Sequence, residues 1–278
     1  MLGGALKRLV LGKLAKSRNP QPTEIVMIAG HEVTIRSGSY PAKPDYDYAW
    51  QAALARDARV VFDIGANKGQ TAFNVLLGGG VEHLVLVEAN PEAMVIAAEN
   101  LIRNGLSSEV RFVTAFLNDE SGGEVEMFVV GAGSAGSIFS SHSTTAARFD
   151  RRIPVRTMTM DEVVERMGIL PDLVILDVEG AEHAVLLGAT STVTASRPQI
   201  LVEMHSPEEI GGMVGNARRI LTWCLESGYR AWYLAEHREL RDAGQISHRG
   251  RCHLLLQSAE LEFPKVLREI PQGAPLSG

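Results

Sequence analysis

The chain has 278 residues, of which 45% are hydrophobic and 22% charged, and its formal net charge is −6. This length holds one large α/β domain or two small domains, and the composition is typical of a folded globular protein. The acidic balance argues against a general nucleic-acid-binding protein, which would usually be basic. The two distant cysteines, Cys224 and Cys252, indicate neither a disulfide framework nor a zinc site, so we expect a reducing, cytoplasmic location.

Residues 1–20 carry several lysines and arginines and no acid, among leucines at near-helical spacing. This pattern predicts a basic amphipathic helix, which could touch an anionic membrane surface or pack against a partner, including a second copy of the chain. The cations interrupt the apolar run, which argues against a secretory signal. No stretch approaches 18 uninterrupted apolar residues, so no spanning helix is expected.

Residues 21–58 are predicted to form an extension that contains a β-hairpin and a helix. From 59 to 262, strands are expected in RVVFDIG, EHLVLVEAN, EVRFVTAFL, PDLVILDVEG and RPQILVEMH, each followed by a further element. Such β-α repeats predict a mostly parallel sheet with helices on both faces. The last two strands, YRAWYLAEH and RCHLLLQSA, have no helix between them and are expected to form an antiparallel edge hairpin. Residues 263–278 are expected to be a tail.

The Gly- and Ser-rich segment 131–149 separates two alternating strand-like runs and is too long for a simple connection. Loops of this length are usually functional or disordered. We expect it to cover the bound acceptor, with hydroxyl groups and His142 available for hydrogen bonds. The alternative is a mobile solvent loop.

The segment VVFDIGANKGQT, residues 60–71, places a glycine turn between the first core strand and the next helix. A dinucleotide turn has the pattern G-x-G-x-x-G, and its second glycine is here replaced by Asn67; the P-loop pattern is also absent. Gly65 is expected to allow a tight turn, and Gly69 a close approach of the backbone to a ligand.

Glu88 ends the second strand, where a carboxylate can accept hydrogen bonds from both ribose hydroxyls of a nucleoside. Asp63, just before the turn, would repel a diphosphate but suits a ligand with ammonium and sulfonium groups. S-adenosylmethionine (SAM) combines a nucleoside with such a cationic tail and has no phosphate. The alternative, a structural turn with incidental acids, is disfavoured by the paired placement of Asp63 and Glu88.

Several blocks between residues 60 and 205 resemble the FkbM family of SAM-dependent methyltransferases: VFDIGANKGQTA, VEANPEA, GSIFSS, TMTMDEVV and, most specifically, LDVEGAEHAVLLGA. The resemblance implies an α/β, Rossmann-like class I methyltransferase fold with a mostly parallel seven-stranded sheet. It also implies O-methylation of a sugar, polyketide or related secondary metabolite. Relatives often carry a lysine where this chain has Ile175, so its acceptor could differ.

The cofactor is expected to lie over the glycine turn and the ends of the neighbouring strands. The predicted cofactor-binding residues are Asp63, Gly65, Ala66, Asn67, Gly69, Gln70, Thr71, Glu88, Ala89, Asn90, Ala115 and Asp177.

A sugar hydroxyl has a high pKa, so methyl transfer to it benefits from a base or a metal. His205 is the preferred base, because its unperturbed pKa lies near working pH. Asp177 is the competing base, and Glu179 is a third catalytic candidate that could instead cap the following helix, as could Glu182. The predicted substrate-binding residues are Ser137, His142, Glu179, Glu182 and Glu203.

Asp177, Glu203 and His205 could also bind Mg²⁺ or Mn²⁺, which would acidify a coordinated hydroxyl. Two other functions stay open. A nucleobase N-methyltransferase usually shows N/D-P-P-Y/F after the fourth strand, where this chain reads LDVEG. A non-catalytic scaffold with this fold would not need polar groups at so many strand ends. We therefore expect a small hydroxylated substrate and no nucleic-acid partner.

Overall fold

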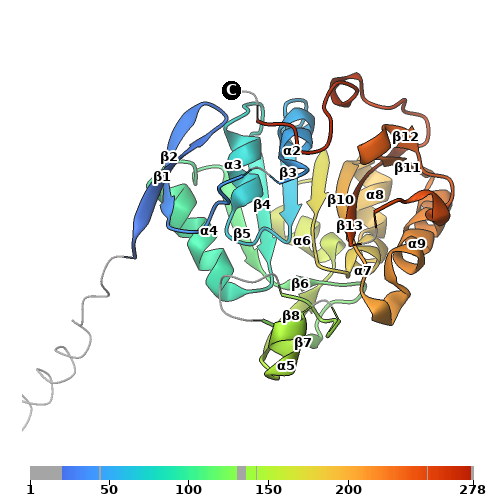
Figure 1. Cartoon of the computed structure of the whole chain (residues 1–278), viewed down its shortest axis with the longest axis horizontal. Helices are drawn as coiled ribbons and strands as arrows, with labels where there is room; N and C mark the ends of the chain where they lie inside the picture. Colours follow the sequence, from blue (N-terminus) through green and yellow to red (C-terminus); the bar gives the residue numbers. More distant parts are fainter. Residues whose placement is uncertain (1–20, 44, 130–135, 142, 249, 277–278) are drawn as a thin grey trace, which may run out of the picture.

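A computed structural model of the chain describes residues 21–43, 45–129, 136–141, 143–248 and 250–276 (Figure 1). The predicted helix at 1–20 lies outside these residues. The main sheet has eight strands in the order β12-β11-β13-β10-β9-β3-β4-β5. Their bounds are β3 (Val60–Ile64), β4 (His83–Glu88), β5 (Val110–Thr114), β9 (Leu173–Leu176), β10 (Gln199–His205), β11 (Tyr229–Tyr233), β12 (Arg238–Glu239) and β13 (Arg251–Ser258).

Strands β5, β4, β3, β9 and β10 are mutually parallel, as the β-α repeats predict. Counted from β3, the first six strands follow the Rossmann order 3-2-1-4-5-6, with β13 inserted antiparallel between β10 and β11. The predicted pairing of the last two long strands is confirmed, but their place is not. β13 is an interior strand, which agrees with its unbroken apolar run Leu254, Leu255 and Leu256, and the two-residue β12 forms the edge.

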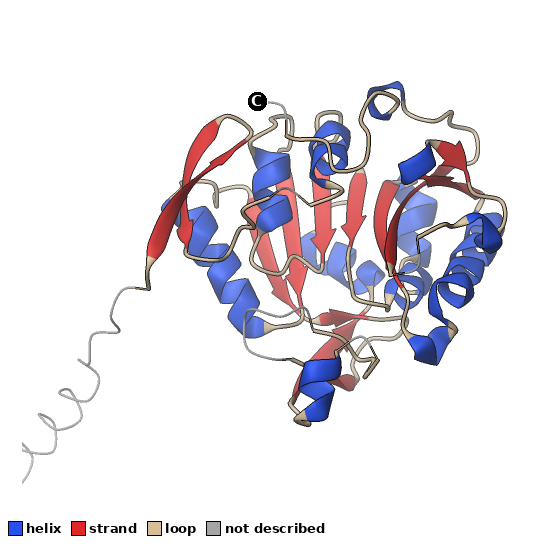
Figure 2. Cartoon of the chain, in the orientation of Figure 1, coloured by secondary structure: helices blue, strands red, loops and turns tan. Residues whose placement is uncertain are grey.

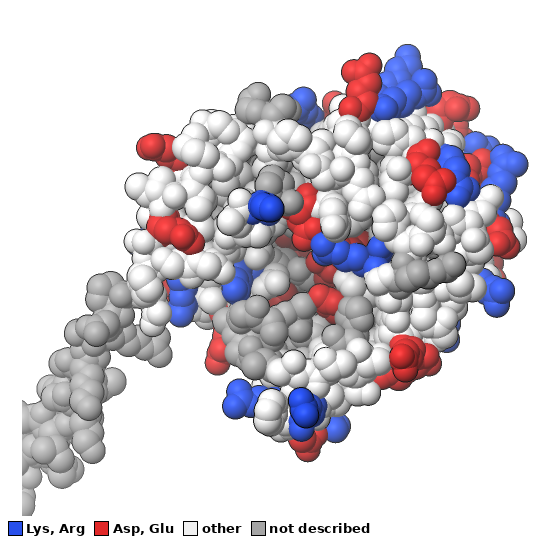
Figure 3. Space-filling model, viewed as in Figure 1, with Lys and Arg blue, Asp and Glu red and all other residues white. Residues whose placement is uncertain are grey.

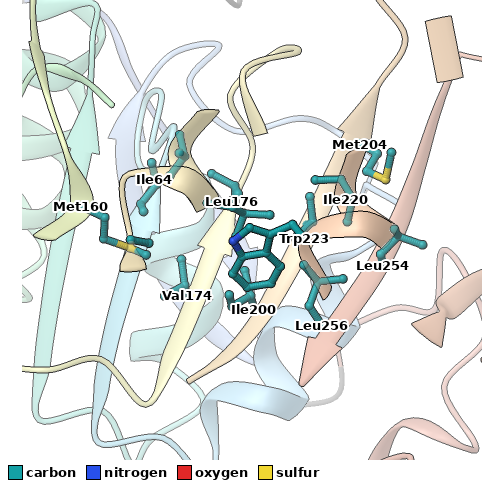
Figure 4. Close-up of a cluster of buried hydrophobic side chains, with 14 of the residues drawn as sticks. Ile64, Met160, Val174, Leu176, Ile200, Met204, Ile220, Trp223, Leu254 and Leu256 are labelled. Carbon is teal, nitrogen blue, oxygen red and sulfur yellow. The ribbon is translucent and has the colours of Figure 1, made fainter. Parts of the chain in front are cut away.

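Helices cover both faces of the sheet (Figure 2). One face packs against α2 (Tyr48–Ala55), α3 (Gln70–Leu76) and α4 (Pro91–Arg103), through residues such as Trp50, Phe73 and Leu101. The other packs against α6 (Met160–Met167), α7 (Glu182–Leu187), α8 (Thr190–Ser196) and α9 (Gly212–Ser227). In Figure 4, Trp223 and Ile220 of α9 lie over the apolar side chains of β9, β10 and β13.

Helix α8 was not predicted, because its sequence TSTVTAS consists largely of residues with low helix propensity. Asp161 of α6 accepts hydrogen bonds from the backbone amides of Ser191 and Thr192, at 2.9 and 2.8 Å. These are first-turn amides that have no partner within their own helix. The first turn of α8 is therefore stabilised by a residue of another helix, and no local sequence pattern predicts that contact.

The extension and the C-terminal segment share the core of the main sheet. The predicted hairpin is present as β1 (Thr23–Ile28) and β2 (His31–Arg36), and β2 packs on α4. The indole Nε1 of Trp50 donates a hydrogen bond to the carbonyl of Ile270 at 2.9 Å. Phe263 and Leu267 are buried in the same core. Residues 263–276, expected to be a tail, thus include a segment that packs against α2.

A small second sheet of order β6-β8-β7 follows β5, with β6 (Phe116–Leu117), β7 (Glu124–Phe128) and β8 (Arg152–Met158). Between β7 and β8 the chain forms α5 (Thr144–Arg148), so the described part of segment 131–149 includes a short helix where a loop was expected. Within the described residues, no helix combines the length and apolar character needed to cross a membrane.

Candidate active site

The carboxyl ends of four adjacent strands meet at one edge of the main sheet. Val87 of β4 pairs with Ile64 of β3, and Ile64 pairs with Leu176 of β9. Leu176 pairs in turn with Val202 of β10. The order of the strands reverses between β3 and β9, which is where open α/β sheets bind ligands. The next residue of each strand forms a row across this position: Glu88, Gly65, Asp177 and Glu203.

Gly65 lies where a larger residue does not fit. Its φ is +93°, and a Cβ atom built on it would lie 1.7 Å from the backbone oxygen of Asp177. Gly69 also has a positive φ, of +85°, but a Cβ there would meet the Cβ of Ala97 at 3.2 Å. Gly69 therefore allows α3 to pack closely against α4, and the predicted close approach to a ligand is not its structural role.

The backbone amides of the turn are already used within the protein. Those of Gly65 and Ala66 donate to the carbonyl of Val87, at 2.8 and 3.0 Å. That of Asn67 donates to Oε2 of Glu88 at 2.8 Å. A pyrophosphate site needs such amides to point at the ligand. This turn is therefore unsuited to a diphosphate.

Glu88 both holds the turn and lines a cavity. Besides the amide of Asn67, it accepts the amide of Asn90 at Oε1, at 2.6 Å. Burial raises the pKa of Glu88, and these amide hydrogen bonds oppose the rise. The side chain of Asn90 accepts from the amide of Glu92 at 3.0 Å, so this predicted cofactor residue caps α4.

A cavity lies beside this row, and its lining includes Ile64, Glu88 and Asp177. Six of the predicted cofactor-binding residues line it: Gly65, Asn67, Glu88, Ala89, Ala115 and Asp177. The other six do not: Asp63, Ala66, Gly69, Gln70, Thr71 and Asn90.

Asp63 is one of the six predicted residues that do not line the cavity. Its side chain is 1% exposed and lies within the sheet. Burial, and then the charge of Glu88, raise the pKa of Asp63 well above its usual range. Its Oδ2 has no hydrogen-bond partner among the described residues, so direct contact with a ligand's ammonium group stays a prediction.

The apolar part of the cavity lining comes largely from the small sheet. Phe116, Leu117, Met127 and Gly136 line the cavity together with Ala115. Such a lining suits a flat ring. Ala115 was predicted, but Phe116, Leu117, Met127 and Gly136 were not, because no local sequence pattern indicates that the small sheet lies beside the ends of the main strands.

A second group of side chains extends from Asp177 away from the turn. Nε2 of His205 lies 3.4 Å from Glu179, 3.8 Å from Asp177 and 3.6 Å from Glu203. Its Nδ1 lies 2.9 Å from Oε1 of Glu182. The structure thus brings all three predicted catalytic residues together, with Glu203.

Glu182 was predicted to bind substrate, but its side chain is fully buried. Its oxygens accept from the amide of Gly180 and from Nδ2 of Asn216, each at 2.9 Å, in addition to contacting His205. Asn216 also donates to the carbonyl of His205 at 2.9 Å. Glu182 and Asn216 therefore orient the imidazole from behind.

The neighbouring carboxylates favour the protonated form of His205. Burial favours the neutral ring, but the hydrogen bond to Glu182 and the carboxylates of Asp177 and Glu179 outweigh it and raise the pKa of His205 to about 10. The ring is therefore an imidazolium near neutral pH. An imidazolium already carries the proton that a base would have to accept, so this charge state argues against His205 as the base.

The charged ring predicts a pH-dependent stability. The pKa of His205 rises from 6.5 to about 10 on folding, so its stabilisation is complete below pH 6.5 and is lost as pH rises towards 10. Wild type should lose free energy of unfolding across this window, by on the order of a few kcal/mol. His205→Gln should flatten that loss. Urea unfolding of both proteins across the window measures it, and equal slopes would contradict the assignment.

The chain around Ser137 is anchored to the site. Ser137 is buried, and its hydroxyl donates to the carbonyl of Glu179 at 2.8 Å. Glu209 accepts from the hydroxyl of Ser140 at 2.9 Å and from the amide of Ser141 at 3.1 Å. The hydroxyl of Ser137 therefore ties this segment to the backbone of Glu179. The predicted His142 lies outside the described residues.

Carboxylates gather in the hollow of the face shown in Figure 3. Glu203, predicted to bind substrate, is nearly buried and accepts from Nη1 of Arg251 at 2.7 Å. Arg251 also donates to Asp45 at 2.6 Å. Neither partner was predicted, because both lie far from the family-like blocks and each looks like an ordinary surface charge in sequence.

Two groups of side chains have the composition of cation sites: Asp177, Glu179 and His205, and separately Asp47, Glu203 and His253. In each group three potential ligand atoms lie within 4.8 Å of one another. The predicted metal set of Asp177, Glu203 and His205 is thus divided between two groups.

Among solved structures, the chain is similar to methyltransferase FkbM from Methylobacillus flagellatus KT, at 14% identity and a TM-score of 0.48. The match covers 77% of this chain and 48% of that one, about half its length. It is also similar to cofactor-bound Rv0187 from MTB, at 18% identity and a TM-score of 0.47, covering 79% and 83% of the two chains.

A third similar structure is TYW2 from M. jannaschii in complex with AdoMet, at 13% identity and a TM-score of 0.46, covering 85% of this chain and 84% of that one. No curated protein matches significantly. The sequence model of the methyltransferase FkbM domain matches residues 63–231, more than half of the chain, from the glycine turn to β11. The protein is therefore a member of the FkbM family of methyltransferases.

Proposed function

We propose that this protein is a SAM-dependent O-methyltransferase that acts on a hydroxyl of a neutral sugar, polyketide or related metabolite. One observation carries the proposal. Asp177 lines the cavity beside Gly65 and Glu88, and it also faces His205. A single side chain thus joins the predicted cofactor space to the predicted acceptor space.

The residues present fit SAM. Glu88 is placed to accept from ribose hydroxyls, and the wall of Ala115, Phe116 and Met127 suits an adenine ring. The occupied amides of the turn leave no cradle for phosphate. SAM, when bound, supplies the methyl group as an electrophilic sulfonium.

We assign proton removal from the acceptor to Asp177. Its Oδ1 is buried and has no hydrogen-bond partner among the described residues. Burial and then the charge of Glu203 raise the pKa of Asp177, and the charge of His205 lowers it. The adjacent imidazolium of His205 stabilises the ionised form of Asp177, and Glu179 lines the same cavity.

The charged side chains around His205 and Glu203 favour an acceptor without negative charge. Asp45, Asp177, Glu179 and Glu203 supply four carboxylates against the cations Arg251 and His205. Carboxylates accept hydrogen bonds from hydroxyl groups and repel phosphates. These charges therefore favour a polyhydroxylated acceptor over a nucleic acid.

The first experiment is calorimetric titration with SAM and, separately, NAD. SAM binding without a NAD response supports the cofactor assignment. The protein is then incubated with SAM and neutral sugars, polyketide-type alcohols, amines and RNA, and products are identified by mass spectrometry. Methylation of amines or RNA in preference to alcohols would overturn the O-methylation proposal, and failure to bind SAM would overturn the whole assignment.

Glu88→Ala should weaken SAM binding by about 10- to 100-fold, because it removes hydrogen bonds to a charged acceptor. Glu92→Ala is the matched control, since Glu92 is exposed one turn along the same segment. Calorimetry gives both dissociation constants, and thermal melts verify that the turn remains folded. Equal affinities in the two variants would show that the ribose lies elsewhere.

A further inference from the structure

We propose a second site, which shares Glu203 with the candidate active site: a divalent transition-metal ion bound by Asp47, Glu203 and His253. Asp47 precedes α2, Glu203 is in β10 and His253 is in β13, where it pairs with Glu203 across the sheet. Asp47 and His253 both lie outside the segment that matches the family model. Two of the three proposed ligands therefore come from outside that segment.

The three donor atoms converge as ligands do around an ion. Nε2 of His253 lies 3.3 Å from Oε2 of Glu203 and 3.8 Å from Oδ2 of Asp47. Ligand atoms each about 2.0–2.2 Å from one ion would lie at comparable distances from one another. Two carboxylates and a neutral imidazole also carry the charge that balances a divalent cation.

The imidazole is the observation that separates this group from an ordinary acidic cluster. The side chain of His253 is 3% exposed, and its buried Nε2 is directed at both carboxylates without a hydrogen bond of good geometry to either. A buried polar atom without a well-formed hydrogen bond is unfavourable. An ion between the three side chains would satisfy this nitrogen and both carboxylates at once.

Outer contacts hold the two carboxylates in place. Asp47 accepts from Nε2 of Gln51 at 2.6 Å, and Gln51 in turn accepts from Asn74 at 2.8 Å. Oε1 of Glu203 accepts from Arg251, which leaves Oε2 directed at His253. Such second-layer hydrogen bonds orient ligands in known metal sites.

The ligand types favour Zn²⁺, Mn²⁺ or a similar first-row ion over Mg²⁺ or Ca²⁺, which prefer oxygen ligands alone. A bound ion would tie the segment before α2 to the sheet. It would also lie next to the catalytic wall, because Oε1 of the shared Glu203 is 3.6 Å from Nε2 of His205.

The test is calorimetric titration of the full chain with Zn²⁺ and with Mn²⁺ after chelation, using protein purified without a metal-affinity tag. We expect one ion per chain in wild type, loss of that event in His253→Gln and in Asp47→Asn, and retention in the exposed control His31→Gln. No binding in wild type overturns the proposal. Loss in His205→Gln with retention in His253→Gln also overturns it, by placing the ion at Asp177 and Glu179.

A second measurement covers variants that fail to fold. Crystals of the wild-type chain soaked in Mn²⁺ or Zn²⁺ should show an anomalous difference peak between Asp47, Glu203 and His253. A peak only at another place would overturn the site. Neither experiment uses SAM or an acceptor, so the outcome is independent of the proposed methyl transfer.

Discussion

Asp177→Asn is expected to lower kcat by about 10²- to 10⁴-fold while SAM affinity stays nearly unchanged. The amide keeps the size of the side chain but cannot accept the acceptor's proton. Initial rates at saturating SAM, together with calorimetric SAM binding, separate the two effects. A fall in SAM affinity with an unchanged kcat would instead assign Asp177 to the cofactor.

Asp172→Asn provides the matched control for this experiment. Asp172 lies just before the same strand, at its opposite end, where it accepts the backbone amides of Arg59 and Val60, each at 2.9 Å. Its loss should lower stability modestly and leave kcat in place. A comparable fall of kcat in both variants would indicate a general effect of charge or folding.

Gly65→Ala is expected to destabilise the protein by more than about 4 kcal/mol, enough to prevent folding of an ordinary domain. The new methyl group would overlap the backbone oxygen of Asp177, at 1.7 Å, and φ is +93°. Neither strand end can move away, because each is hydrogen-bonded within the central sheet. Soluble yield and urea unfolding measure the effect.

Gly122→Ala separates the effect of the atomic overlap from the effect of the positive φ. Gly122 has a similar φ of +82°, but nothing lies within 4 Å of the new Cβ. It should therefore show the cost of left-handed backbone alone, about 1–2 kcal/mol. If Gly65→Ala cost no more than Gly122→Ala, the close contact between β3 and β9 would be weaker than the structure indicates.

The parallel sheet and the residues at its strand ends could be predicted, because each apolar run and the polar residue that follows it are visible in a short stretch of sequence. Glu88 and Asp177 follow apolar runs, and parallel strands bring such positions together. The same reasoning did not show the packing of Gly69 against α4 or the burial of Asp63. Whether a turn residue faces a ligand or a neighbouring helix depends on packing that involves residues such as Ala97, far along the chain.

The electrostatics of the wall could not be predicted residue by residue. His205 looked like a base because its ordinary pKa is near neutrality, but the buried Glu182 changes its charge. Asp47 and His253 are 206 positions apart in the chain, and only the fold shows that they meet. Such pairings depend on the tertiary arrangement, which one sequence does not display.

The interior position of β13 has a consequence for synthesis on the ribosome. β11 is made before β13, yet it has no place in the sheet until β13 pairs with β10. Until residue 258 has emerged, β10 keeps an open edge, and α9 packs against an incomplete surface. Nascent chains generally fold from the N-terminus, and open edges invite wrong pairing. Chaperone binding should therefore concentrate on chains that end between β11 and β13.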